Sequence, residues 1–86
     1  MPNPEGIKGL FLEAPESQID LSVKPLIEAW DDPPTTLQML RVLDEMARYA
    51  AGSEFSIMAL DLMLQDALKD EGQTYEQLVA QATWRV

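Results

Sequence analysis

The sequence has 86 residues, with fifteen acidic side chains against six basic ones, and its formal net charge is −9 at pH 7. A chain of this length forms one small domain with a limited hydrophobic core, and its charge repels nucleic-acid phosphates and anionic membrane surfaces. The sequence contains no cysteine and no histidine, which excludes disulfides, thiolate metal sites and any catalytic pairing of serine or cysteine with histidine.

No apolar run is long enough to cross a bilayer, and the first residues lack the basic-then-apolar pattern of a signal peptide. We therefore expect a cytoplasmic protein, although a matured exported chain would have the same features. Residues 1–6 contain two prolines and a glycine and are expected to form a flexible tail. A single small domain then follows over residues 7–86.

The first predicted element is a β-hairpin that pairs residues 8–13 with residues 19–24. Apolar and polar side chains alternate over residues 19–24, which is the period of a half-buried strand. A proline and a serine between the two segments are typical of a turn. The alternative for this region is a short helix that begins at Ser22 or Pro25 and ends at Trp30.

A long amphipathic helix is predicted next, with Asp32 as its N-cap, Pro33 at its first position and Gly52 at its end. Asp44 and Arg48 have the i,i+4 spacing of an acid-before-base ion pair. Eight apolar residues cover about half of the helix circumference: Met39, Leu40, Val42, Leu43, Met46, Ala47, Tyr49 and Ala50.

The second long helix is predicted to start with Ser53 as its cap and Glu54 in its first turn, and to continue to Asp70. One side carries a core stripe at helical spacing: Ile57, Leu60, Leu64, Ala67 and Leu68. The opposite side of its first half is apolar too, where a surface helix is usually polar: Phe55, Met58, Ala59 and Leu62. A helix that is apolar all round expects cover on both sides.

A third, short helix follows, because Thr74 and Gln77 form the pattern of a capping box. Its apolar residues are Tyr75, Leu78, Val79 and Ala82, and it is expected to end near Trp84. The predicted fold class is therefore α+β and mostly helical, with an N-terminal β-hairpin, two antiparallel helices and a short third helix.

Two segments resemble known families. Residues 7–50, through the order of hairpin, Trp30-Asp31-Asp32-Pro33 and amphipathic helix, resemble a small bacterial domain family of unknown function, which implies the fold order and no activity. Phe55-Ser56-Ile57-Met58-Ala59-Leu60 resembles the segment around the phosphopantetheine-bearing serine of acyl and peptidyl carrier domains. That likeness implies attachment at Ser56, although Phe55 replaces the usual Asp or His and the long loop before the serine is missing.

The extra apolar side of the second helix gives the main functional prediction, which is a non-catalytic protein that needs no metal or cofactor and associates through this helix. Its contacts are predicted to be Phe55, Met58, Ala59, Leu62 and Met63. A homodimer is the first form considered, because most oligomers of small proteins are symmetric homodimers, and an accessory partner protein is the second. The alternatives are the carrier protein and an acidic inhibitor or immunity-type protein for a basic partner. The predicted hairpin is a further candidate to cover this side.

Overall fold

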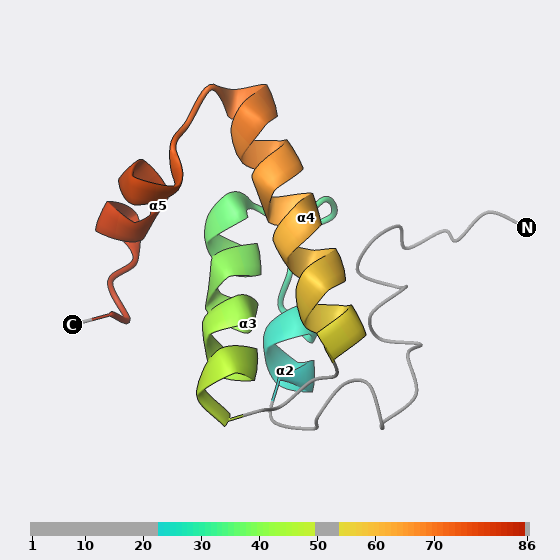
Figure 1. Cartoon of the computed structure of the whole chain (residues 1–86). Coiled ribbons are helices and arrows are strands. Elements are labelled where there is room, and N and C mark those ends of the chain that lie inside the picture. The colour runs from blue at the N-terminus through green and yellow to red at the C-terminus, as the bar shows by residue number, and fades with distance from the viewer. Residues whose placement is uncertain (1–22, 50–53, 86) are drawn as a thin grey trace, which may run out of the picture.

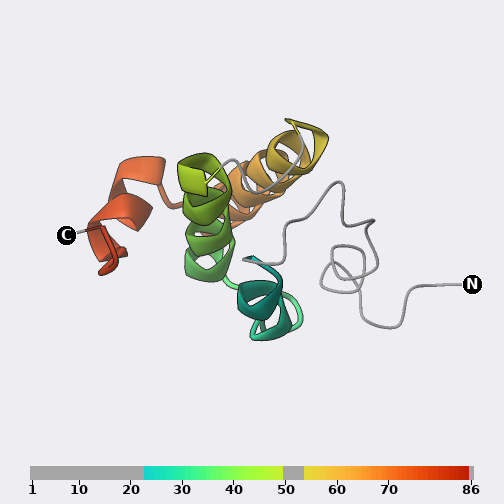
Figure 2. The same cartoon turned by 90° about the horizontal axis from the view of Figure 1, so that it is seen from below.

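The computed structural model of the chain describes residues 23–49 and 54–85, and these ranges hold four helices. The helices are α2 (Lys24–Glu28), α3 (Thr36–Tyr49), α4 (Glu54–Glu71) and α5 (Tyr75–Gln81). Helix α3 is central, with α4 running antiparallel along one side of it and α5 on the other (Figure 1). The view from below shows the same order, with α2 also beside α3 (Figure 2).

The core is one cluster to which all four helices contribute. Its fully or nearly buried apolar side chains are Val23, Ile27, Trp30, Met39, Leu40, Val42, Met46, Leu60, Leu64, Leu68, Leu78 and Ala82. Met39, Leu40, Val42 and Met46 come from the apolar half of α3, as its periodicity predicts. Trp30 packs at the start of α3, where its Nε1 donates to the carbonyl of Gln38 at 3.1 Å.

The predicted β-hairpin is wrong, because the described residues contain no strand and form a small all-α fold. Residues 8–13 and 19–22 lie outside the described ranges, but the last two residues of the expected second strand lie at the start of a helix. Val23 is the N-cap of α2 and Lys24 its first residue, and Pro25 in the first turn is compatible with a helix. Val23 and Ile27 are both fully buried at i,i+4 spacing, so helical burial decides the conformation here. The alternative of a short helix is confirmed over Lys24–Glu28.

Helix α3 begins at Thr36, four residues after the cap that the sequence predicts at Asp32. Thr35 caps it instead: its Oγ1 accepts the N–H of Gln38 at 3.1 Å, and the Gln38 Oε1 accepts the N–H of Thr35 at 3.0 Å. This exchange is a capping box. It satisfies two backbone donors at once, whereas Asp32 lies exposed ahead of the helix.

The same Gln38 side chain also ties α3 to the connection from α2. Its Oε1 accepts the N–H of Asp31 at 3.1 Å, and its Nε2 lies 3.3 Å from the Asp31 Oδ2 and 3.5 Å from the carbonyl of Ala29. One amide therefore fixes both the first turn of α3 and the segment that precedes it.

Helix α4 starts at Glu54 as the sequence predicts, while its proposed cap Ser53 lies outside the described residues. Its core stripe is confirmed, since Leu60, Leu64 and Leu68 are buried and Ile57 and Ala67 are partly buried. The helix ends at Glu71 in a Schellman turn: the N–H of Gln73 bonds the carbonyl of Leu68 at 3.0 Å and that of Gly72 bonds Lys69 at 3.2 Å. Gly72 has a φ of +64°, a conformation that favours glycine.

The capping box of α5 is confirmed, because the Thr74 hydroxyl accepts from the N–H of Gln77 and the Gln77 amide accepts from the N–H of Thr74. Leu78 and Ala82 bury the inner side of this helix. It ends at Gln81, slightly before the expected end near Trp84. The residues after it contact α3, since the side chains of Trp84 and Arg85 both donate to Asp44.

Candidate functional site

The predicted interaction side of α4 holds the two most exposed large apolar side chains among the described residues. Met58 and Leu62 lie one helical turn apart and have 64% and 66% of their surface exposed. Ala59 and Met63 beside them are partly buried, and Met63 packs against the core. We call Met58, Ala59, Leu62 and Met63 the α4 face. The side chain of Phe55, the fifth predicted contact, lies outside the described residues.

The α4 face is exposed because the core needs only the other side of the helix. Leu60, Leu64 and Leu68 already fill the space toward α3. Residues two positions away from such a stripe point well away from it at about 100° per residue. The first half of α4 therefore carries more apolar surface than its own core uses.

Acidic side chains flank the α4 face. Asp61 is partly exposed and accepts from the Nε2 of Gln65 at 3.3 Å, and Asp66 is exposed one turn beyond Leu62. A hollow of about 330 Å³ adjoins the face and shares Met63 with it. It is lined by Pro33, Pro34, Met39, Met63, Asp66, Ala67, Asp70 and Glu71. The hollow thus combines an apolar floor with three carboxylates.

Ser56, the residue that the carrier resemblance points to, is buried with 4% of its surface exposed. A transferase has to reach the hydroxyl of a serine that it modifies. The position of Ser56 on the inner side of α4 therefore counts against the carrier alternative.

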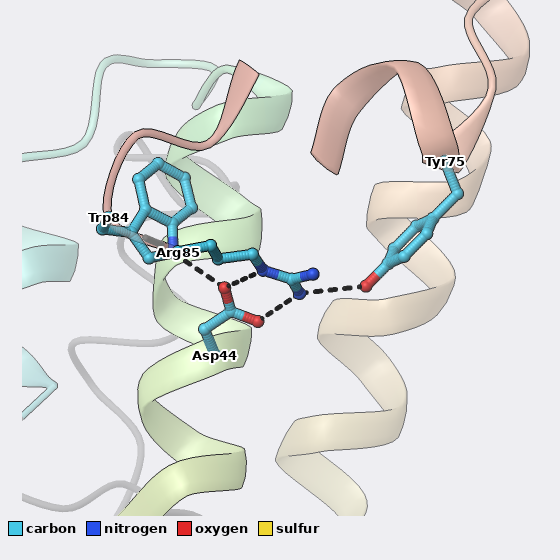
Figure 3. A network of polar contacts seen from close by, with 4 residues as sticks. All are labelled: Asp44, Tyr75, Trp84 and Arg85. Atoms are coloured by element: carbon cyan, nitrogen blue, oxygen red, sulfur yellow. Dashed lines mark hydrogen bonds and ion pairs between the residues drawn. The ribbon is translucent and has the colours of Figure 1, made fainter. Parts of the chain in front are cut away.

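A network of polar contacts, which the sequence does not predict, joins α3 to the residues after α5 (Figure 3). The Asp44 carboxylate accepts from Arg85 twice, with Oδ1 2.6 Å from Nη2 and Oδ2 2.8 Å from Nε, and Oδ2 also accepts from Trp84 Nε1 at 2.7 Å. Tyr75 Oη lies 3.4 Å from Arg85 Nη2. The expected Asp44–Arg48 pair is replaced by this arrangement, while Arg41 and Glu45 form an i,i+4 pair at 3.6 Å.

The contacts within this network shift the pKa values of Asp44 and Arg85. The hydrogen-bonded guanidinium of Arg85 holds the pKa of Asp44 below its usual range, although partial burial acts in the opposite direction and the Trp84 N–H adds to the lowering. The same pair raises the pKa of Arg85 above its already high ordinary value. Both groups are charged at neutral pH, so they form an ion pair that joins α3 to the residues after α5.

Within residues 23–49 and 54–85, no three His, Cys, Asp or Glu side chains are placed so that they could hold a metal ion together. In the same part of the chain, no helix combines the length and apolar character needed to span a bilayer. Two surface features bring apolar side chains together: the α4 face with its acidic surroundings, and a hollow beside Arg41 and the two tryptophans. The sequence does not predict the hollow beside Arg41, because its residues are far apart along the chain and come together only in the folded structure.

No protein-family model, curated protein or solved structure matches this chain.

Proposed function

We propose that the protein acts without catalysis, by docking the α4 face against another protein. The observation that carries this proposal is the pair Met58 and Leu62, two large apolar side chains about two-thirds exposed on successive turns of one helix. Helices that bind grooves present anchors at this spacing. Apolar side chains gathered on one surface are typical of interaction sites.

The charge around the face favours a basic partner over a second copy of the same chain. Asp61 and Asp66 flank the anchors, and a symmetric dimer would bring two such acidic rims and two net charges of −9 together. A partner with apolar side chains surrounded by lysine or arginine would match both features. The carboxylates of Asp70 and Glu71 beside the neighbouring hollow extend the same match.

A synthetic amphipathic helix tests this chemistry directly. The probe is a peptide of about 20 residues with leucine on one face and lysine on the flanks, and its match has glutamate in place of lysine. We expect the lysine peptide to bind and to shift the NMR methyl signals of Met58 and Leu62, with an affinity that falls as salt rises. The glutamate peptide should not bind.

Two variants decide whether the α4 face is the contact. Leu62→Gln should weaken binding of the lysine peptide about tenfold, because it removes a central apolar anchor. Ala80→Gln makes an exposed apolar position of α5 polar and should leave binding unchanged. Equal binding of both peptides, or equal losses in the two variants, would contradict the proposal. If the wild type sediments as a dimer and the Leu62→Gln variant as a monomer, the partner of the α4 face is a second copy of the chain and not a basic protein.

A further inference from the structure

A hollow of about 260 Å³ lies between α2, the first half of α3 and the residues after α5. It is lined by Leu26, Ala29, Trp30, Leu37, Gln38, Arg41 and Trp84. None of these residues belongs to α4, so the hollow is separate from the face proposed for protein association. Its lining is apolar apart from Gln38 and Arg41.

The two tryptophans of the chain both line this hollow, and hydrogen bonds hold each of them in place. Trp30 Nε1 donates to the Gln38 carbonyl at 3.1 Å, and Trp84 Nε1 donates to the Asp44 carboxylate at 2.7 Å. The aromatic walls are therefore fixed from two separate parts of the chain. Fixed walls lower the entropic cost of binding a ligand between them.

Arg41 is the only charged residue among those that line the hollow. Its guanidinium carbon lies 5.5 Å from the centre of the Trp84 ring, which is within the range of a cation–π contact. Its ion pair with Glu45 is long at 3.6 Å, and its buried Nε has no hydrogen-bond partner. A guanidinium has five N–H donors, so Arg41 keeps the capacity to bind a further carboxylate.

We propose that this hollow binds a small carboxylate with an apolar tail, such as a medium-chain fatty acid. The tail would lie among the leucine and tryptophan side chains, and the carboxylate would bind a terminal nitrogen of Arg41, whose Nη2 also faces Glu45 at 3.6 Å. The volume is near the lower end of ligand pockets, which favours a small ligand. Glu45, at 3.6 Å from Arg41, competes with the ligand for the guanidinium, whereas exposed acids beyond about 8 Å are screened at physiological salt.

Titration with octanoate, followed by tryptophan fluorescence, tests the proposal, because every tryptophan of the chain lines the hollow. We expect a saturable change, and binding about tenfold weaker for octan-1-ol, which has the same tail without the charge. Arg41→Gln should weaken octanoate binding by a similar factor and leave octan-1-ol unaffected. Arg48→Gln makes the same charge change at an exposed site in the last turn of α3 and should alter neither.

A third variant fills the hollow without touching the charge. Ala29 is exposed in the right-handed helical region, with φ of −84°, so Ala29→Leu is compatible with the backbone and should abolish binding of both ligands. The proposal is overturned if the wild type gives no saturable signal up to about 10 mM octanoate. It is also overturned if octan-1-ol binds as tightly, or if Arg48→Gln weakens binding as much as Arg41→Gln. Should a variant fail to fold, the comparison of the two ligands on the wild type decides alone.

Discussion

The carboxylate of Asp44 on α3 holds the guanidinium of Arg85, 41 residues further along the chain, in a two-pronged ion pair of 2.6 and 2.8 Å. The pair is partly shielded, with 19% of the Asp44 side chain and 33% of the Arg85 side chain exposed. The contact fixes the residues after α5 against the middle helix of the fold. It also positions Trp84 through the same carboxylate.

Asp44→Asn should lower the free energy of unfolding by about 1 to 2 kcal/mol, because it weakens a bidentate pair together with the Trp84 bond. For a domain of this size each kcal/mol corresponds to a fall of roughly 4–8 °C in melting temperature. Thermal unfolding followed by circular dichroism measures the change. Asp61→Asn is the matched control, since it makes the same charge change where the only described contact is with Gln65. An equal effect of the two substitutions would show that the Asp44–Arg85 pair contributes nothing specific.

The pKa of Asp44 gives a pH dependence with a definite sign. Its folded pKa is lowered from the unfolded value of about 3.9, so its contribution is complete above that value and is lost as the pH falls through the folded pKa. The difference in unfolding free energy between wild type and Asp44→Asn should stay constant from about pH 5 to pH 8 and narrow below about pH 4. Urea denaturation at a series of pH values measures it. A difference that widens on acidification would contradict the assignment.

Gln38→Ala should destabilise the fold by about 1 to 2 kcal/mol, because it removes the acceptor of the Thr35 and Asp31 N–H groups together. Asp32→Ala should have no measurable effect, since Asp32 is exposed and lies ahead of the helix. Chemical denaturation of the two variants compares the observed cap with the one that the sequence predicts. A larger loss for Asp32→Ala would place the start of the helix there after all.

Substitutions on the two sides of α4 should change the free energy of unfolding by very different amounts. Leu62→Gln changes a side chain that is 66% exposed and should alter the unfolding free energy by no more than about 0.5 kcal/mol. Leu64→Ala leaves a cavity at a fully buried position and should cost about 2 to 5 kcal/mol. Thermal unfolding followed by circular dichroism gives both values. An unfolded Leu62→Gln variant would mean that the protein itself covers this side chain, which would remove the basis of the proposed association.

Helical periodicity and capping patterns predict much of this fold because they are local. The Thr74–Gln77 box, the core stripe of α4 and the placement of Met58 and Leu62 opposite that stripe all follow from spacing along one helix. The errors occur where two local signals compete. Asp32 and Pro33 have the pattern of a helix start, and the sequence therefore predicts the cap of α3 at Asp32. Thr35 and Gln38, which form the observed cap, have the same Thr-x-x-Gln spacing that predicts the start of α5 correctly.

The hairpin prediction is wrong because it rests on an alternation of apolar and polar side chains over only six residues. The burial of Val23 together with Ile27 on one side of a helix outweighs that alternation. The features that no local pattern predicts depend on distant parts of the chain. Asp44 has an i,i+4 partner available in Arg48, and only the folded arrangement brings Arg85 closer. The apolar hollow forms only when Trp84, near the end of the chain, packs beside α3, so no spacing along the sequence predicts its lining.

The bonds of Gln38 limit which mutations this chain can accept. A single base change turns a glutamine codon into a glutamate codon, and a capping box accepts either residue. At Gln77 glutamate would keep the acceptor for the Thr74 N–H and place a negative charge at the favourable end of a helix. At Gln38 it would lose the amide donors and set a second carboxylate about where Nε2 now lies, 3.3 Å from the Asp31 Oδ2. In a sequence that already carries fifteen acids, position 38 is one where a further acid would be selected against.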